Sequence, residues 1–182
     1  MNKRASYHPF AKFLHWTIVV LVAIQFVSGW LMPSMRHGVN ANYFTIIHLY
    51  WGLLLIPLAA LLFFMRFYKP VARPETDTAS GFVKIATIGT HYLFYLLLLL
   101  IPLSGWVAVS IREAQISFFN LFSMPLTTIN NPSILYTFGK MHSELATFLG
   151  LVALGHIAAA LYHHFVLKDS VLERMRVVGK VD

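Results

Sequence analysis

The sequence predicts an all-α integral membrane protein, a four-helix bundle with both termini cytoplasmic. Composition is the first reason: 58% of the 182 residues are apolar and 12% are charged, whereas soluble proteins average roughly 25% charged residues. The second is that four windows without formal charge are each longer than the roughly 20 residues that a membrane-spanning helix needs. They are residues 13–35, 37–65, 85–111 and 145–167. We therefore expect one domain, 1–182, with spans at about 13–32, 43–66, 85–110 and 141–167.

The positions of the cations predict the orientation. With the N-terminus inside, only Arg36, Arg112 and Lys140 of the 14 lysines and arginines fall in outer segments, and by the positive-inside rule this makes both termini cytoplasmic. The cations flank the apolar windows, as charges facing lipid headgroups do. We therefore expect membrane lipid, and no nucleic acid, as a partner. The inner cations are Lys3, Arg4, Lys12, Arg66, Lys69, Arg73, Lys84, Lys168, Arg174, Arg176 and Lys180.

The chain contains no cysteine. This excludes disulfides, thiolate-ligated haem, haem attached covalently through a CxxCH motif, and cysteine-held iron–sulfur clusters. Any redox chemistry must therefore depend on histidine, of which the chain has nine.

The first predicted helix opens at its cytoplasmic end with His15 and Trp16, and Trp16 is expected to anchor the helix at the interface. Residues 34–42 form a short polar outer loop. The second helix opens outside and places His48 about one turn below the outer surface. It ends at Arg66, and residues 69–84 form a polar cytoplasmic connector.

The third predicted helix carries His91 in its inner third and Pro102 farther out, where neighbouring helices allow a proline kink. Residues 112–140 are expected to form a long outer segment with a turn at 130–133. Its aromatic residues favour a partly ordered piece over 113–139 that lies on the membrane surface, either covering an outer cofactor or merely interfacial.

The fourth predicted helix carries two histidines on nearly one face. His142 and His156 lie fourteen residues apart, which places them within about 40° of each other around the helix and roughly 21 Å apart along it. One helix can therefore offer imidazoles to two stacked cofactors. Glu144, in the expected first turn, would complement the helix dipole.

The histidines sort by depth into two levels. Ionisable groups inside a bilayer are costly, and paired imidazoles hold the iron of b-type haem. We therefore predict two haems, the outer one held by His48 and His142 and the inner one by His156 with either His15 or His91, a choice that spacing leaves open. The alternative is a set of histidines that only pack or hydrogen-bond between helices.

Other residues have weaker assignments. His163 follows His156 by seven residues at the inner boundary, where it is either a snorkelling interfacial residue or a contact for quinone or haem propionate. Five glycines in the spans allow close approach of the backbone, either for haem clearance or for helix packing. These are Gly52, Gly89, Gly105, Gly150 and Gly155.

Taken together, these motifs resemble the bacterial cytochrome b561 family over essentially the whole chain. The motifs are His15-Trp16, His48, Thr90-His91-Tyr92, Ile101-Pro102-Leu103-Ser104-Gly105, His142-Ser143-Glu144, Gly155-His156 and the closing His163-His164-Phe165. The resemblance implies two haem b groups, an outer one on His48 and His142 and an inner one on His15 and His156. It makes His91 a non-ligand near the inner haem, with a proton, quinone or supporting role.

The resemblance also implies an activity and a location. Short members of the family look like superoxide oxidases, which pass electrons from superoxide outside, through both haems, to ubiquinone. The expected location is the bacterial inner membrane, and association into a homodimer is left open. A second hypothesis is a di-haem electron carrier or anchor subunit for a dehydrogenase or another redox partner. A third is a haem-free membrane protein whose histidines only pack or bind a metal.

Overall fold

The computed structural model describes residues 7–33, 42–68, 81–110, 117–118, 122–123 and 131–176. Within them, four helices are long and apolar enough to cross a membrane, which confirms the predicted helical class. A hairpin of two-residue strands, β1 (Ser117–Phe118) and β2 (Phe122–Ser123), is the one departure from it in the described chain. The helices are α1 (Pro9–Leu31), α2 (Tyr43–Tyr68), α3 (Gly81–Ser110) and α4 (Pro132–Tyr162).

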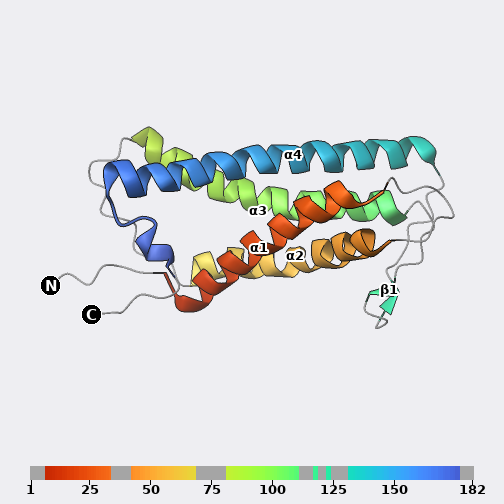
Figure 1. Cartoon of the computed structure of the whole chain (residues 1–182), viewed down its shortest axis with the longest axis horizontal. Helices are drawn as coiled ribbons and strands as arrows, with labels where there is room; N and C mark the ends of the chain where they lie inside the picture. Colours follow the sequence, from red (N-terminus) through yellow and green to blue (C-terminus); the bar gives the residue numbers. More distant parts are fainter. Residues whose placement is uncertain are drawn as a thin grey trace.

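The helices alternate in direction and form two close pairs. Figure 1 shows α1 beside α2 and α3 beside α4, and α2 packs on α3 to join the pairs. No comparably close packing joins α1 to α4 in the described part of the chain. Because each helix reverses the direction of the previous one, α1 begins at the end of the bundle where α4 finishes (Figure 1). The side of the membrane on which this end lies stays a prediction.

Helix α4 begins earlier than predicted, and its start was mistaken for a turn. The side chain of Asn131 caps the helix by accepting hydrogen bonds from the Ser133 backbone N–H at 3.0 Å and from the Ser133 hydroxyl at 2.8 Å. Pro132 lies in the first turn of the helix. A proline costs no helix hydrogen bond there, because the backbone N–H groups of the first turn have no acceptor within the helix. The prediction that 112–140 is entirely a loop is therefore wrong for residues 132–140.

The early start also corrects the role given to Glu144. Its carboxylate lies too far along α4 to act on the N-terminal dipole, which extends over the first turn only. It pairs instead with Lys140, one turn earlier, at 3.7 Å. At 31 residues, α4 is about 46 Å long, well beyond the roughly 30 Å of the hydrocarbon core.

After α4 the chain turns back and binds the start of α1. The π-helical turn η1 (His163–Leu167) ends at Lys168, whose φ of 51° lies in the left-handed region, and the short 3-10 helix η2 (Glu173–Met175) follows. The Trp16 indole N–H donates to the Met175 carbonyl at 2.9 Å, and the Lys12 ammonium donates to the Arg176 carbonyl at 3.1 Å. We call residues 168–176 the C-terminal hook; it links α1 to the end of α4.

The most buried apolar residues form a layer through the middle of the bundle. Leu14, Leu55, Leu97 and Leu149, one from each helix, are between 2% and 7% exposed. Burying such side chains stabilises a fold by roughly 1.5–3 kcal/mol each in water, whereas within lipid their close packing is what favours association. The full apolar layer is Leu14, Ile18, Leu21, Leu55, Ala59, Leu97, Leu98 and Leu149.

Several predicted features lie outside the described residues. They include the outer loop at 34–41, most of the connector at 69–84, the outer cations Arg36 and Arg112, and most of the 113–139 segment. The hairpin within the 113–139 segment is described only by its backbone pairing, which joins Ser117 to Ser123 and Phe118 to Phe122. The two alternatives for this segment, covering an outer cofactor or merely lying at the interface, stay predictions.

Candidate functional site

The structure brings His48 of α2 and His142 of α4 together. Their ring centroids lie 5.9 Å apart and their ring planes cross at 74°. The two residues are 94 positions apart in the sequence and come from different helix pairs, so only the closed bundle can form this outer pair. Their meeting agrees with the two being placed at one depth.

Each imidazole of the outer pair donates to a backbone carbonyl on the neighbouring helix of its own hairpin. His48 Nδ1 lies 3.1 Å from the Gln25 carbonyl of α1, and His142 Nδ1 lies 2.8 Å from the Ile101 carbonyl of α3. A carbonyl oxygen can only accept, so each ring carries its proton on Nδ1 and leaves the Nε2 lone pair available. This is the arrangement found for histidines that bind metals through Nε2.

The outer pair fits the metal of a b-type haem. His48 and His142 would hold the iron through their free Nε2 atoms, and the haem would supply one-electron chemistry. Their ring separation of 5.9 Å brings both imidazoles within reach of one metal. Two buried donors, Gln25 Nε2 on α1 and Trp106 Nε1 on α3, have no partner among the described residues. Unmatched buried donors favour a polar ligand group nearby.

Two glycines make room for the outer imidazoles. A Cβ on Gly105 would lie 2.8 Å from His142 Nδ1, and one on Gly29 would lie 3.0 Å from His48 Cε1. Gly105 was among the glycines singled out from the sequence and Ser104 was named only within the family motif, but Ser28 and Gly29 were missed. The available signal was a repeated tripeptide, since Ser-Gly-Trp occurs at 28–30 and again at 104–106. By contrast, Gly89 and Gly155 would meet nothing within 4 Å.

The inner histidines form a second cluster. The rings of His91 on α3 and His156 on α4 lie 5.5 Å apart at 89°, and His15 on α1 lies within electrostatic range of both. His91 Nδ1 donates to the carbonyl of Thr87 in its own helix at 2.7 Å. The cluster contains all three inner candidates, and by proximity the histidine neighbour of His156 is His91.

His163 lies at the start of the turn that leads into the C-terminal hook. Its Nδ1 is hydrogen-bonded to the Asp169 carboxylate, whose other oxygen accepts from the Val171 N–H at 3.0 Å. Burial alone would raise the pKa of Asp169, but the bonds from His163 and Val171, with the charges of His163 and Arg174, hold this pKa below its usual value. The carboxylate fixes the orientation of the imidazole and leaves Nε2 for another partner.

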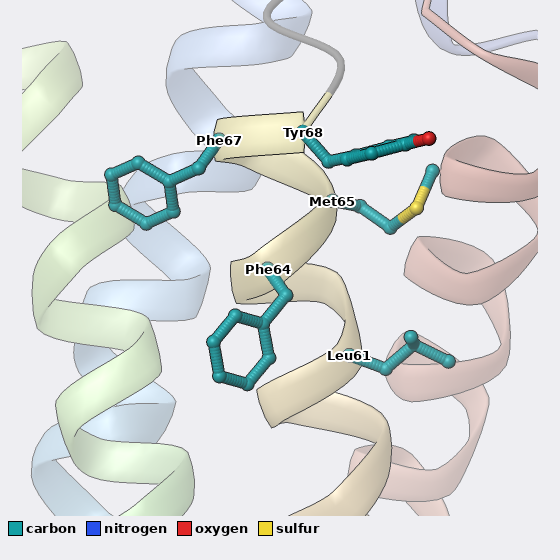
Figure 2. A pocket seen from close by; sticks show the side chains of 5 residues that line it. All are labelled: Leu61, Phe64, Met65, Phe67 and Tyr68. Atoms are coloured by element: carbon teal, nitrogen blue, oxygen red, sulfur yellow. The ribbon is translucent and has the colours of Figure 1, made fainter.

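A shallow apolar hollow lies on the inner half of α2. Figure 2 shows its five lining side chains, all from this helix, with Leu61, Met65 and Tyr68 on one flank and Phe64 and Phe67 on the other. Phe64 and Tyr68 are well exposed, as expected for a helix face that contacts lipid chains. None of the candidate histidines lines it.

Known proteins resemble this chain over nearly its whole length. The family model for prokaryotic cytochrome b561 matches residues 6–176. Cytochrome b561 homolog 2 of Escherichia coli (strain K12) is 26% identical over 175 residues, covering 96% of this chain and 93% of that protein. The Yersinia pestis protein named Probable superoxide oxidase CybB is 29% identical over 167 residues, covering 89% and 90%. Cytochrome b562 of Cereibacter sphaeroides is 29% identical over 180 residues, covering 96% and 98%.

Proposed function

This chain belongs to the prokaryotic cytochrome b561 family of multi-pass membrane haem proteins, and from that premise we propose that it is a superoxide:ubiquinone oxidoreductase with two b-type haems. In this proposal His48 and His142 bind the outer haem iron, and His15 and His156 bind the inner one. Two superoxide anions each lose one electron and leave as O₂, while one ubiquinone gains both electrons and takes up two protons. The haems, when bound, accept and release single electrons.

The observation that carries this proposal is the presence of two histidine clusters at two depths of one bundle. His48 and His142 meet at one level, and His15, His91 and His156 gather at the other. Between them lie Leu21, Leu97 and Leu149, apolar members of the layer defined above. Such side chains disfavour water and ions between the two levels, while electrons can pass between cofactors without any movement of the protein.

We assign the second inner ligand to His15 for a physical reason. A haem is a large flat ring, and helices α3 and α4, which carry His91 and His156, pack closely on each other. Helices α1 and α4, which carry His15 and His156, have no comparably close packing in the described chain, so a macrocycle between them would displace fewer helix–helix contacts. His91 then supports the inner site without binding its metal.

The inner end of the bundle supplies groups for the quinone. We assign His163 a role as a hydrogen-bond partner of ubiquinone, because Asp169 orients its ring and leaves Nε2 unassigned. The side chain of His163 is 27% exposed, so a ligand can reach it. His91 is the second candidate for a quinone or proton contact.

The test uses purified protein in lipid nanodiscs. Pyridine haemochrome analysis should give two b-type haems per chain, and superoxide generated enzymatically should reduce a soluble ubiquinone analogue with no added partner protein. Two haems without superoxide-driven quinone reduction would contradict the proposed reaction and leave the cytochrome assignment intact. A colourless protein, expressed with ample haem supply, would contradict both.

A second function has its own support. Three of the similar proteins are named as cytochromes rather than for superoxide chemistry, which favours a di-haem carrier or anchor that takes electrons from a larger redox partner. Haem reduction by such a partner, but not by superoxide, would identify this case. In either case we place the protein in the bacterial inner membrane, with homodimer formation to be measured by native mass spectrometry.

A further inference from the structure

The two Ser-Gly-Trp tripeptides occupy equivalent positions in the two helix hairpins. Ser28 and Gly29 of α1 contact His48 of the next helix. In the other hairpin Gly105 of α3 lies against His142 of the next helix, and Ser104 shares an acceptor with it. In both hairpins the imidazole donates to the carbonyl three residues before the serine, that of Gln25 or Ile101. The tryptophans differ, since Trp30 is 92% exposed whereas the indole N–H of Trp106 is buried. The shared element is therefore the Ser-Gly pair.

The two serines do different things with their hydroxyl groups. Ser104 Oγ donates to the Ile101 carbonyl at 2.7 Å, and His142 Nδ1 donates to the same oxygen at 2.8 Å. One carbonyl thus serves two donors and is a weaker acceptor for each of them. Ser104 therefore competes with His142 for its anchor.

Ser28 acts as an additional acceptor. Its hydroxyl has one proton and two lone pairs, and of the two carbonyls within its reach, that of Ile24 at 2.7 Å and that of Gln25 at 3.3 Å, the closer one takes the proton. The oxygen then faces His48 Nδ1 at 3.2 Å, next to the Gln25 carbonyl at 3.1 Å. A hydroxyl that donates one hydrogen bond is a better acceptor for the next. Ser28 therefore strengthens the anchoring of His48.

We propose that Ser28 and Ser104 are positioning residues that tune the basicity of the two outer imidazoles in opposite directions. This inference rests on the proposed function, because it takes His48 and His142 as the ligands of the outer haem. Hydrogen bonding to the distal N–H of a metal-bound imidazole raises its basicity, and a more basic ligand stabilises ferric over ferrous iron. Ser28 lowers the midpoint potential of the outer haem, and Ser104 raises it.

The experiment is a spectroelectrochemical titration of the holoprotein in nanodiscs, with Ser28→Ala and Ser104→Ala variants. Ser28→Ala should shift the outer midpoint potential upward, and Ser104→Ala should shift it downward. Each shift should correspond to a change of roughly threefold to tenfold in the reduced-to-oxidised ratio at fixed potential, as expected for one hydrogen bond. The double variant should lie near the wild type. A His142→Ala sample, which keeps only the inner haem, assigns the two waves.

Thr45→Val is the matched control, because Thr45 is 1% exposed and its hydroxyl donates to the Asn42 side chain at 2.9 Å, a hydrogen bond that involves no imidazole. It should leave both potentials unchanged. Shifts of the same sign in the two serine variants, no shift, or an equal shift of the inner haem would overturn the inference. If an alanine variant loses haem, Ser→Cys at the same position must give a smaller shift of the predicted sign. Absence of an outer haem in the wild type would refute the proposed function instead.

Discussion

The outer and inner halves of the bundle hold their histidines by different means. Outside, the imidazoles of His48 and His142 are hydrogen-bonded to carbonyls of neighbouring helices and lie against glycines. Inside, the contacts are mainly between ring edges: His156 meets His91 at 5.5 Å and Phe94 at 5.3 Å, and His15 meets Trp16 at 5.6 Å. Hydrogen bonds fix a ring's rotation, whereas apolar ring contacts allow several rotations at similar energy.

This difference indicates where the bundle is already arranged for a ligand. The outer site is formed by helices that pack closely within each hairpin, so its two rings are held by the fold itself. His15 and His156, the pair proposed for the inner iron, lie on α1 and α4, which are linked through the C-terminal hook, by Trp16 to Met175 and by Lys12 to Arg176. We therefore expect the inner site to depend more on its cofactor and on the hook.

Removing an outer ligand should have the largest effect. His142→Ala should eliminate the outer haem and superoxide reactivity while leaving most of the inner haem, because the apolar layer separates the levels. Haem content and the reduced-minus-oxidised spectrum measure this. Equal loss of both haems would mean that the two halves are not independent, and His48→Ala serves as the paired variant.

Two variants test which histidine is the second ligand of the inner haem. His15→Ala should lose the inner haem, whereas His91→Ala should keep it with an altered rate of quinone reduction, because only His15 is assigned as a ligand. Haem stoichiometry is the first measurement and quinone-reduction kinetics the second. Loss of haem from His91→Ala alone would instead identify His91, on α3, as the second inner ligand.

Glycine variants test how tightly the outer rings are held. Gly105→Ala places a Cβ 2.8 Å from His142 Nδ1, and overpacking of this kind costs about 1–3 kcal/mol, so outer-haem retention and thermal stability should fall. Gly155→Ala on α4 is the control, since its Cβ would meet nothing within 4 Å. Similar losses from both would show that helix packing, not clearance for the imidazole, explains the effect.

The smallest effect is expected at the C-terminal hook. The pKa of Asp169 is held below its usual value of 3.8 in the folded protein. The stability that its carboxylate contributes is therefore complete above pH 3.8 and is lost as the pH falls through the lower pKa of the folded state. Asp169→Asn should increase hydrogen exchange of residues 168–176 at neutral pH, and the wild type should approach this behaviour only in strong acid. Glu144→Gln, at an exposed ion pair on α4, should leave the hydrogen exchange of residues 168–176 unchanged at neutral pH and in acid.

Local sequence rules succeeded where one helix contains the whole signal. The apolar windows predicted four helices, and the fourteen-residue spacing of His142 and His156 placed one at each level. The rules failed at Asn131-Pro132, because the same two residues can form a turn or cap a helix, depending on the conformation of the residues after them. They also missed Ser28 and Gly29, whose importance depends on His48, a residue of another helix.

The sequence by itself determined that this is a membrane protein of four apolar helices without cysteine, and that histidines occur at two depths. Those properties follow from composition and from spacing along single helices, which need no knowledge of neighbours. Only the tertiary structure decided that the Gln25 and Ile101 carbonyls anchor the outer imidazoles, that α1 and α4 form the loosely packed side, and that the hook returns to Trp16. Each of these is a contact between distant segments, and its geometry is set by how the helices pack against one another.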